Sequence, residues 1–182
     1  MKKLVFATLM CVAAMSARAQ VLTSETVNHI YSEAVFNTTN GDYCFNADKN
    51  GNDITTLYVY QKVSGPKGNV TLIPHLKHEY DYASDGKLNN RVTYRWNDRL
   101  EDWECISRYE YTLTDEIYYT EYSRYNHRTK SFDQPTDMMV YTLYPDDSIN
   151  HVASYHRNSP SAPFQLISEI SVNEQPWLLA IK

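Results

Sequence analysis

Part of the chain repeats itself after 29 residues, and this repeat constrains the fold more than any other feature. YEYTLTD, starting at Tyr109, aligns with YDYASDG at Tyr80, and SRYNHRTKSF at 123–132 aligns with YRWNDRLEDW at 94–103. A third and less regular copy begins near Met139. Self-similarity at a fixed period indicates one supersecondary unit used several times. We place the repeats at residues 76–104, 105–134 and 135–164.

Within each repeat, apolar and polar residues alternate with the period of two that is typical of a β-strand. Turn signals such as Asp85-Gly86 separate the runs, and the chain contains sixteen tyrosines but only five glycines. The pattern predicts an all-β fold, an antiparallel meander of tandem hairpins of about 29–30 residues, curled or folded over into a two-layer or barrel-like sheet. In the run 88–96, the face predicted to be buried carries Leu88, Val92, Tyr94 and Trp96, and the face predicted to be wet carries Asn89, Arg91, Thr93 and Arg95.

One segment near the N-terminus has two readings. Val27, Ile30 and Ala34 recur at helical spacing, with Ser24 available as an N-cap, but the same residues also fit an alternating strand. We therefore expect at most one short helix in the chain.

The first 19 residues are typical of a signal peptide. Two lysines precede the apolar run LVFATLMCVAAM, and Ala17-Arg18-Ala19 supplies the small-x-small pattern read by a signal peptidase, so cleavage is expected between Ala19 and Gln20. The apolar run is too short to span a membrane. Residues 20–182 would then form a single β-repeat domain, exported to the periplasm or out of the cell.

The charge of the mature chain disfavours two classes of partner. Without the signal peptide, 14 basic and 22 acidic residues remain, a net charge of −8. Such a surface repels nucleic-acid phosphates and anionic lipid, so we expect no nucleic-acid partner. No segment after Gln20 approaches membrane-spanning length.

Two cysteines remain after signal removal, and two alternatives stay open for them. In an exported protein, Cys44 and Cys105 are candidates for a disulfide. They are equally consistent with two separate buried thiols.

Two tryptophans flank the polar loop of the first repeat. The repeat places Trp96 at the end of one strand and Trp103 at the start of the next, with Tyr125 and Phe132 in the same places one repeat later. Residues so placed face each other across a hairpin mouth. Because the second copy changes the ring type, we favour a structural clasp over a sugar-binding platform for these four residues.

Motifs that carry known chemistry are missing from the sequence. No nucleophile elbow, zinc-protease helix or phosphate loop is present, and His75 and His78 would lie on opposite faces of a strand. The stretch 46–53 begins like a calcium loop, but Leu57 stands where the bidentate Glu belongs, so a turn at Asn50-Gly51 is favoured. We expect no catalytic residue, cofactor or metal.

The order of these motifs resembles a known family. LIPHLKHEYDY, then RWN, a second tryptophan and a weaker copy ending in YNHRTKSF are similar to short secreted proteins of Bacteroides and its relatives, a domain-of-unknown-function family (DUF3836-like). The resemblance covers residues 71–158, and the second copy departs from it at Tyr125 and Phe132. It implies export in a Gram-negative bacterium and a hairpin-repeat β fold, and it transfers no catalytic residue.

In such bacteria, Asp147-Ser148-Ile149 also fits a short O-glycosylation pattern, which makes Ser148 a candidate acceptor. The same residues make a good turn by themselves.

Our leading hypothesis is a secreted, non-catalytic β module that binds a glycan or a protein. The candidate binding residues are exposed aromatic and basic side chains: Tyr118, Tyr122, Arg95 and Arg124. The alternatives are an exported carbohydrate hydrolase that uses a carboxylate pair, and a purely structural envelope protein.

Overall fold

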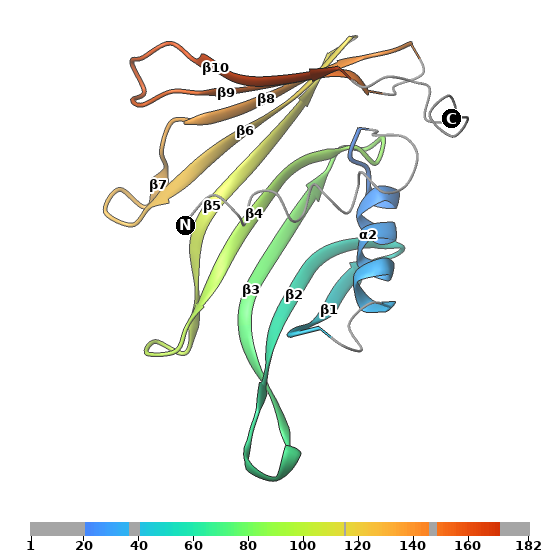
Figure 1. Ribbon diagram of the computed structural model, residues 1–182, viewed down its shortest axis with the longest axis vertical. Helices are drawn as coiled ribbons and strands as arrows, with labels where there is room; N and C mark the ends of the chain where they lie inside the picture. Colours follow the sequence, from blue (N-terminus) through green and yellow to red (C-terminus); the bar gives the residue numbers. More distant parts are fainter. Residues whose placement is uncertain (1–20, 37–40, 115, 146–148, 172–182) are drawn as a thin grey trace, which may run out of the picture. The chain divides into compact units, whose positions relative to one another are not determined.

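The computed structural model describes residues 21–36, 41–114, 116–145 and 149–171 (Figure 1). The predicted signal peptide with its cleavage position at Ala19 and Gln20 lies outside the described residues, as does the glycosylation candidate Ser148.

One helix and ten strands make up the described chain. The sheet order is β1-β2-β3-β4-β5-β6-β8-β9-β10, with β7 paired to β6, and the pairings are antiparallel. The predicted antiparallel meander is therefore confirmed, as an open sheet that is not closed into a barrel. The elements are α2 (Ser24–Phe36), β1 (Tyr43–Asn50), β2 (Asp53–Ser64), the 3-10 turn η2 (Pro66–Gly68), β3 (Val70–Tyr82), β4 (Leu88–Asn97), β5 (Asp102–Leu113), β6 (Ile117–Asn126), β7 (Ser131–Phe132), β8 (Asp137–Leu143), β9 (Ile149–His156) and β10 (Gln165–Ser171).

The ambiguous segment near the N-terminus is the helix α2. The backbone N–H of Thr26 donates to Thr23 Oγ1 at 3.2 Å, so Thr23 provides the side-chain cap that we expected from Ser24. Val27 is buried. Asn28 Nδ2 donates to the carbonyl of Asn52 at 2.8 Å, which ties α2 to the β1–β2 turn.

The turn predicted at Asn50-Gly51 is present. β1 ends at Asn50 and β2 begins at Asp53. Gly51 has φ of 60°, a left-handed conformation that suits glycine.

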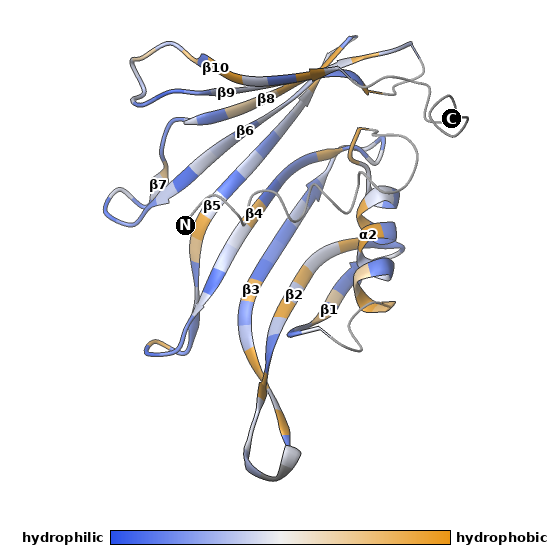
Figure 2. Ribbon diagram, viewed as in Figure 1, coloured by the Kyte–Doolittle hydropathy of each residue, from blue (hydrophilic) through white to orange (hydrophobic). Residues whose placement is uncertain are grey.

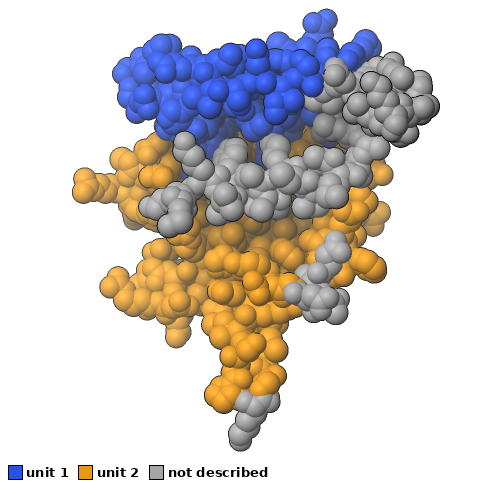
Figure 3. Space-filling view, in the orientation of Figure 1, with its two compact units in different colours: residues 1–21, 111–122, 134–182 blue, residues 22–110, 123–133 orange. Residues whose placement is uncertain are grey.

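The chain divides into two compact units, shown in different colours in Figure 3. Unit 2 comprises residues 22–110 and 123–133, and its buried apolar side chains are Val27, Ile54, Val59 and Leu88. Unit 1 comprises residues 1–21, 111–122 and 134–182, and its core includes Tyr118, Tyr141, Leu143, Ile149 and Ala153.

The face of β4 that was predicted to be exposed to solvent is partly buried. Thr93 lies on that face, yet it is only 7% exposed. Its cross-strand neighbours are His78 and Ser107, and His78 Nδ1 lies 3.0 Å from Thr93 Oγ1 in a hydrogen bond. Ser107 is also only 7% exposed, so this part of the face is buried, and polarity alone was a poor guide to exposure here.

Candidate functional site

Several half-buried aromatic and charged side chains gather on one face of the sheet in unit 2. Tyr58 on β2 is paired with Lys77 on β3, which is paired in turn with Tyr94 on β4. Directly paired residues project to the same face of a sheet. We call this set the aromatic face, and its members are Tyr58, Tyr60, Lys77, Glu79, Tyr94, Trp96 and Trp103.

The aromatic face lies on the opposite side of the sheet from α2. Lys49 Nζ lies 6.0 Å from the centroid of the Tyr31 ring on α2, and the strand partner of Lys49 is the buried residue Ile54. A register shift between Asp48 and Lys49 leaves Tyr58 on the face opposite Ile54. The helix therefore does not cover the aromatic face.

A charged triad occupies the centre of this face. Lys77 Nζ lies 2.7 Å from Glu79 Oε1 and 4.1 Å from the centroid of the Tyr94 ring. The Tyr94 hydroxyl donates to the other Glu79 oxygen, Oε2, at 2.7 Å. The Lys77 side chain is only 16% exposed, so its charge is compensated by a carboxylate and an aromatic ring where little water reaches it.

The hydrogen bonds of the triad fix its protonation. Partial burial raises the pKa of Glu79, but the hydrogen bonds from Lys77 and Tyr94 outweigh this and hold it below its usual value. Burial, followed by the bond to Glu79, raises the pKa of Tyr94. Near neutral pH, Glu79 is therefore an ionised acceptor and Tyr94 a neutral donor. A glycosidase acid needs the opposite shift in its carboxyl pKa.

The rings beside the triad form a continuous row. The Tyr58 centroid lies 6.5 Å from that of Tyr60 and 6.2 Å from that of Trp103. The Tyr58 hydroxyl donates to Asp48 Oδ2 at 3.0 Å, which fixes the ring and raises the tyrosine pKa. All three rings stay partly accessible to solvent. Such a row offers flat apolar surface next to oriented polar groups.

The predicted hairpin clasp is present at one end of the row. Trp96 and Trp103 are paired residues with ring centroids 5.2 Å apart at an interplanar angle of 70°. One repeat later, Tyr125 and Phe132 are also paired, 5.3 Å apart at 74°. The four residues of the clasps thus have the geometry that the repeat predicted.

The four predicted binding residues are divided between the two compact units. Tyr118 is 3% exposed, so its expected exposure was wrong. Its ring is stacked on that of Tyr111, with centroids 6.1 Å apart, and is tilted against that of Tyr141 at 5.5 Å. Tyr122 is half-buried in unit 1, whereas Arg95 and Arg124 are exposed in unit 2. Arg95 is paired with Leu76 and Glu104, on the face opposite Tyr94.

Sequence reasoning missed the residues that do come together. Tyr58 and Tyr60 are separated by two positions, as are Lys77 and Glu79, which is the spacing of neighbours on one strand face. That signal was available, but the pairing of Tyr58 with Lys77 depends on a register that a single sequence does not specify.

The candidate disulfide is not formed. Cys44 on β1 and Cys105 on β5 are free and half-buried. Four strand spacings separate them in the sheet order, roughly 19 Å at about 4.8 Å per step. A disulfide requires a Cα separation under about 7 Å. The alternative of two separate thiols is the correct one.

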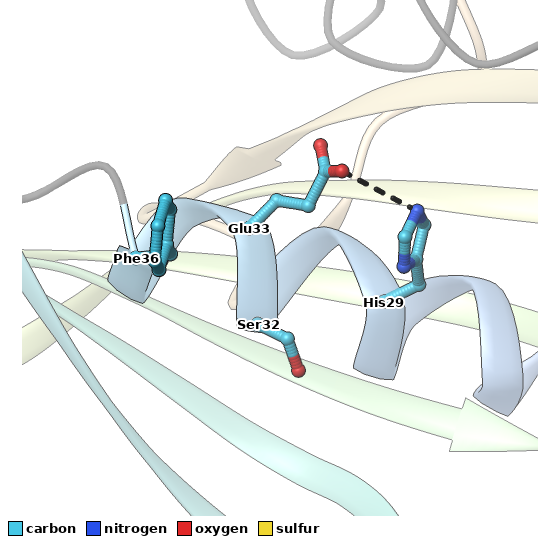
Figure 4. Close-up of a pocket in the computed structure, with 4 residues that line it drawn as sticks. All are labelled: His29, Ser32, Glu33 and Phe36. Carbon is cyan, nitrogen blue, oxygen red and sulfur yellow. Dashed lines mark ion pairs between the residues drawn. The ribbon is translucent and has the colours of Figure 1, made fainter.

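A shallow pocket lies along α2 and is lined by His29, Ser32, Glu33 and Phe36 (Figure 4). His29 Nε2 lies 3.6 Å from Glu33 Oε1, one helical turn away, and Phe36 is 83% exposed. The lining comes from a single helix and contains one exposed ion pair, so it offers little to orient a ligand.

Over the described part of the chain, no three His, Cys, Asp or Glu side chains gather as metal ligands would. Nor does any helix there have the length and apolar character needed to cross a membrane.

Comparison with known proteins places the chain. The model of a family of unknown function (DUF3836) matches residues 1–143. The chain belongs to this family. The match confirms the resemblance to the DUF3836 family that the order of the motifs indicated.

Three solved structures are similar to the chain, and the first of them shares its fold. A crystal structure of a protein of unknown function from Bacteroides fragilis matches with a TM-score of 0.62 and 23% identity, covering 74% of this chain and 96% of that one. A DUF3836 family protein from Bacteroides vulgatus matches with a TM-score of 0.46 and 19% identity, over 59% and 96% of the two chains. A third, from Parabacteroides distasonis, matches with a TM-score of 0.49 and 19% identity, over 56% and 90%. No curated protein matches the chain.

Proposed function

We propose that this DUF3836 protein is an exported, non-catalytic binding module that holds a glycan on its aromatic face. The observation that carries the proposal is the row of partly accessible rings formed by Tyr60, Tyr58 and Trp103, on the sheet face that α2 leaves uncovered. The C–H face of a sugar ring packs on an aromatic ring, and its hydroxyl groups need polar partners close by. The Tyr58 hydroxyl and Asp48 supply such partners beside the row.

The rings are also preorganised. Tyr58 and Tyr60 stand on β2 and Trp103 on β5, and the Lys77–Glu79–Tyr94 triad on β3 and β4 fixes the surface between them. A ligand that binds to groups already held in place costs little side-chain entropy, which favours useful affinity from a small area.

The hydrolase alternative gains no support from this face. Glu79 is held ionised by Lys77 and Tyr94. A carboxylate held in this way accepts hydrogen bonds rather than donating a proton. We therefore assign the aromatic face to binding.

The test is a glycan array probed with the chain from Gln20 onward, followed by calorimetry on the best ligand. Tyr58→Ala should weaken binding at least about tenfold, because it removes the central ring of the row. Tyr58→Phe keeps the ring but loses the bond to Asp48, so it should weaken binding less.

Arg95→Ala is the matched control, because Arg95 neighbours Tyr94 in sequence but lies on the opposite face. Silence on the array, or a loss in Arg95→Ala equal to that in Tyr58→Ala, would overturn the proposal. Cleavage of a bound glycan would favour the hydrolase instead.

A further inference from the structure

The β2–β3 hairpin extends beyond both neighbouring strands (Figure 1). The β1–β2 ladder reaches Gln61 and is followed by one backbone bond, from the Lys62 N–H to the Asp42 carbonyl at 2.8 Å. β4 pairs with β3 only from Leu76 onward. Between these limits, β2 and β3 continue alone as a two-stranded ribbon, closed by η2 and by a bond from the Gly65 N–H to the Asn69 carbonyl at 2.7 Å. We call residues 62–73 the hairpin tip.

The hairpin tip exposes aliphatic side chains on both of its faces. Leu72 is paired with Lys62 and Val70 with Ser64, which puts Leu72 and Val70 on one face. The other face carries Ile73, paired with Gln61, and Val63, paired with Thr71. The exposed fractions are 51% for Leu72, 58% for Val70, 36% for Ile73 and 39% for Val63.

This distribution points to the kind of environment that would cover the tip. A ribbon docked on a protein surface buries one face and keeps the other polar, as strands of an antiparallel sheet do. Apolar side chains on both faces instead suit a medium that surrounds the tip. Figure 2 shows the hydrophobic colouring on both strands of this hairpin.

The charge of the segment indicates which kind of surface the hairpin tip would bind. Residues 61–75 contain Lys62 and Lys67 and no Asp or Glu, whereas the whole chain has a formal net charge of −5. Lysines next to exposed aliphatic residues are typical of segments that bind the interface of anionic membranes. The net charge of the chain therefore conceals a locally basic segment.

We propose that the hairpin tip binds the protein peripherally to the surface of a bilayer containing anionic lipid. Val63, Val70, Leu72 and Ile73 enter the interfacial layer, and the net positive charge of the segment favours anionic headgroups. The outer edges of a two-stranded ribbon carry backbone groups without strand partners, so the tip stays at the interface and does not enter the hydrocarbon core. This inference is independent of the proposed glycan binding.

The test is flotation of the chain from Gln20 onward with vesicles of phosphatidylcholine alone or mixed with phosphatidylglycerol. The protein should float with the anionic vesicles, and less so at high salt, where headgroup attraction is screened. Two double variants, V70D/L72D and V63D/I73D, each change one face of the tip. Each should lower the vesicle-bound fraction at least about tenfold.

Leu100→Asp is the matched control, since Leu100 is 57% exposed in the β4–β5 turn and should be dispensable. Thermal melting checks that every variant is folded. Failure of the wild type to float, or flotation of both double variants like wild type, would contradict the proposal. Loss in only one double variant would contradict the entry of both faces and would show that the tip binds the bilayer through one face. If the wild type were a dimer and the double variants were monomers, the hairpin tip would instead be a contact between two copies of this chain.

Discussion

Trp96 and Trp103 meet edge to face across the mouth of the β4–β5 hairpin, with their ring centroids 5.2 Å apart. Just beyond Trp96, Asn97 Oδ1 accepts the backbone N–H groups of Arg99 and Leu100 at 3.0 and 3.2 Å. One repeat later, Asn126 Oδ1 accepts those of Arg128 and Thr129 at 3.0 and 3.4 Å. The repeat therefore preserves the closing ring pair together with the turn that presents it.

Trp103→Ala should lower the free energy of unfolding by about 1–3 kcal/mol, because it removes a half-buried ring from the clasp. Trp103→Phe should recover most of this loss, since Phe132 fills the equivalent position in the second clasp. Urea unfolding followed by circular dichroism measures both. An unchanged midpoint in Trp103→Ala, combined with lost glycan binding, would show that Trp103 serves the ligand and not the fold.

Glu101→Gly should stabilise the protein by about 0.5–1 kcal/mol. Glu101 has φ of 50°, and Lys130, 29 residues later, has φ of 53°, both in the left-handed region that side chains with a Cβ disfavour. Lys130→Gly should act alike. Glu101→Ala removes the same charge but keeps the Cβ, so a gain of equal size in that variant would rule out relief of backbone strain as the cause. Thermal and urea unfolding provide the comparison.

Stability should fall between pH 7 and pH 5 because of His78. Burial, with a smaller contribution from the Arg91 charge, lowers the pKa of His78 to about 3. The unfolded chain takes up this proton near pH 6.5 and the folded chain only near pH 3. The stability is therefore complete above pH 6.5 and is lost as the pH falls, by about 2 kcal/mol at pH 5.

His78→Gln should flatten this pH dependence, because glutamine does not titrate but can still hydrogen-bond with Thr93. The wild-type protein, measured by urea unfolding at the same pH values, is the comparison. A slope in His78→Gln equal to the wild-type slope would exclude His78 as the source.

Both cysteines should be alkylated without reductant when the chain is unfolded, and a reductant should leave the melting temperature unchanged. The reason is that Cys44 and Cys105 are free thiols on β1 and β5. In the folded protein, burial raises the pKa of Cys105, so its alkylation should be slower than that of an exposed thiol. The rate of Cys105 alkylation is measured by intact mass on the folded Cys44→Ser variant. A mass that gains adducts only after reduction would contradict the free-thiol assignment.

Much of the fold was predictable because its signals are local. The alternation of Val92, Tyr94 and Trp96 specified a strand, and the 29-residue offset that aligns Trp96 with Tyr125 specified repeated hairpins. The sequence left the segment of α2 open between helix and strand, because Val27 and Ile30 fit both periods. In the structure the segment is a helix, and a hydrogen bond from Asn28 to Asn52, 24 residues away, holds it in place.

The site was harder to predict, because it depends on which strand faces lie uncovered. Tyr118 was expected to be an exposed binding residue, but contacts with Tyr111 and Tyr141 bury it. Tyr58 and Lys77 meet only through the β2–β3 register, which a one-residue shift would reverse. Burial and register are tertiary properties, and periodicity within one strand carries little information about them.

The Trp96–Trp103 and Tyr125–Phe132 ring pairs have a consequence for insertions and deletions in such a chain. Each 29-residue block brings its own turn, its own closing pair and its own left-handed residue, at Glu101 or Lys130. Insertion or deletion of a whole block therefore adds or removes a hairpin while every remaining side chain keeps its side of the sheet. Gain or loss of a single residue inside a strand lacks that protection, because it exchanges the two faces from that point onward.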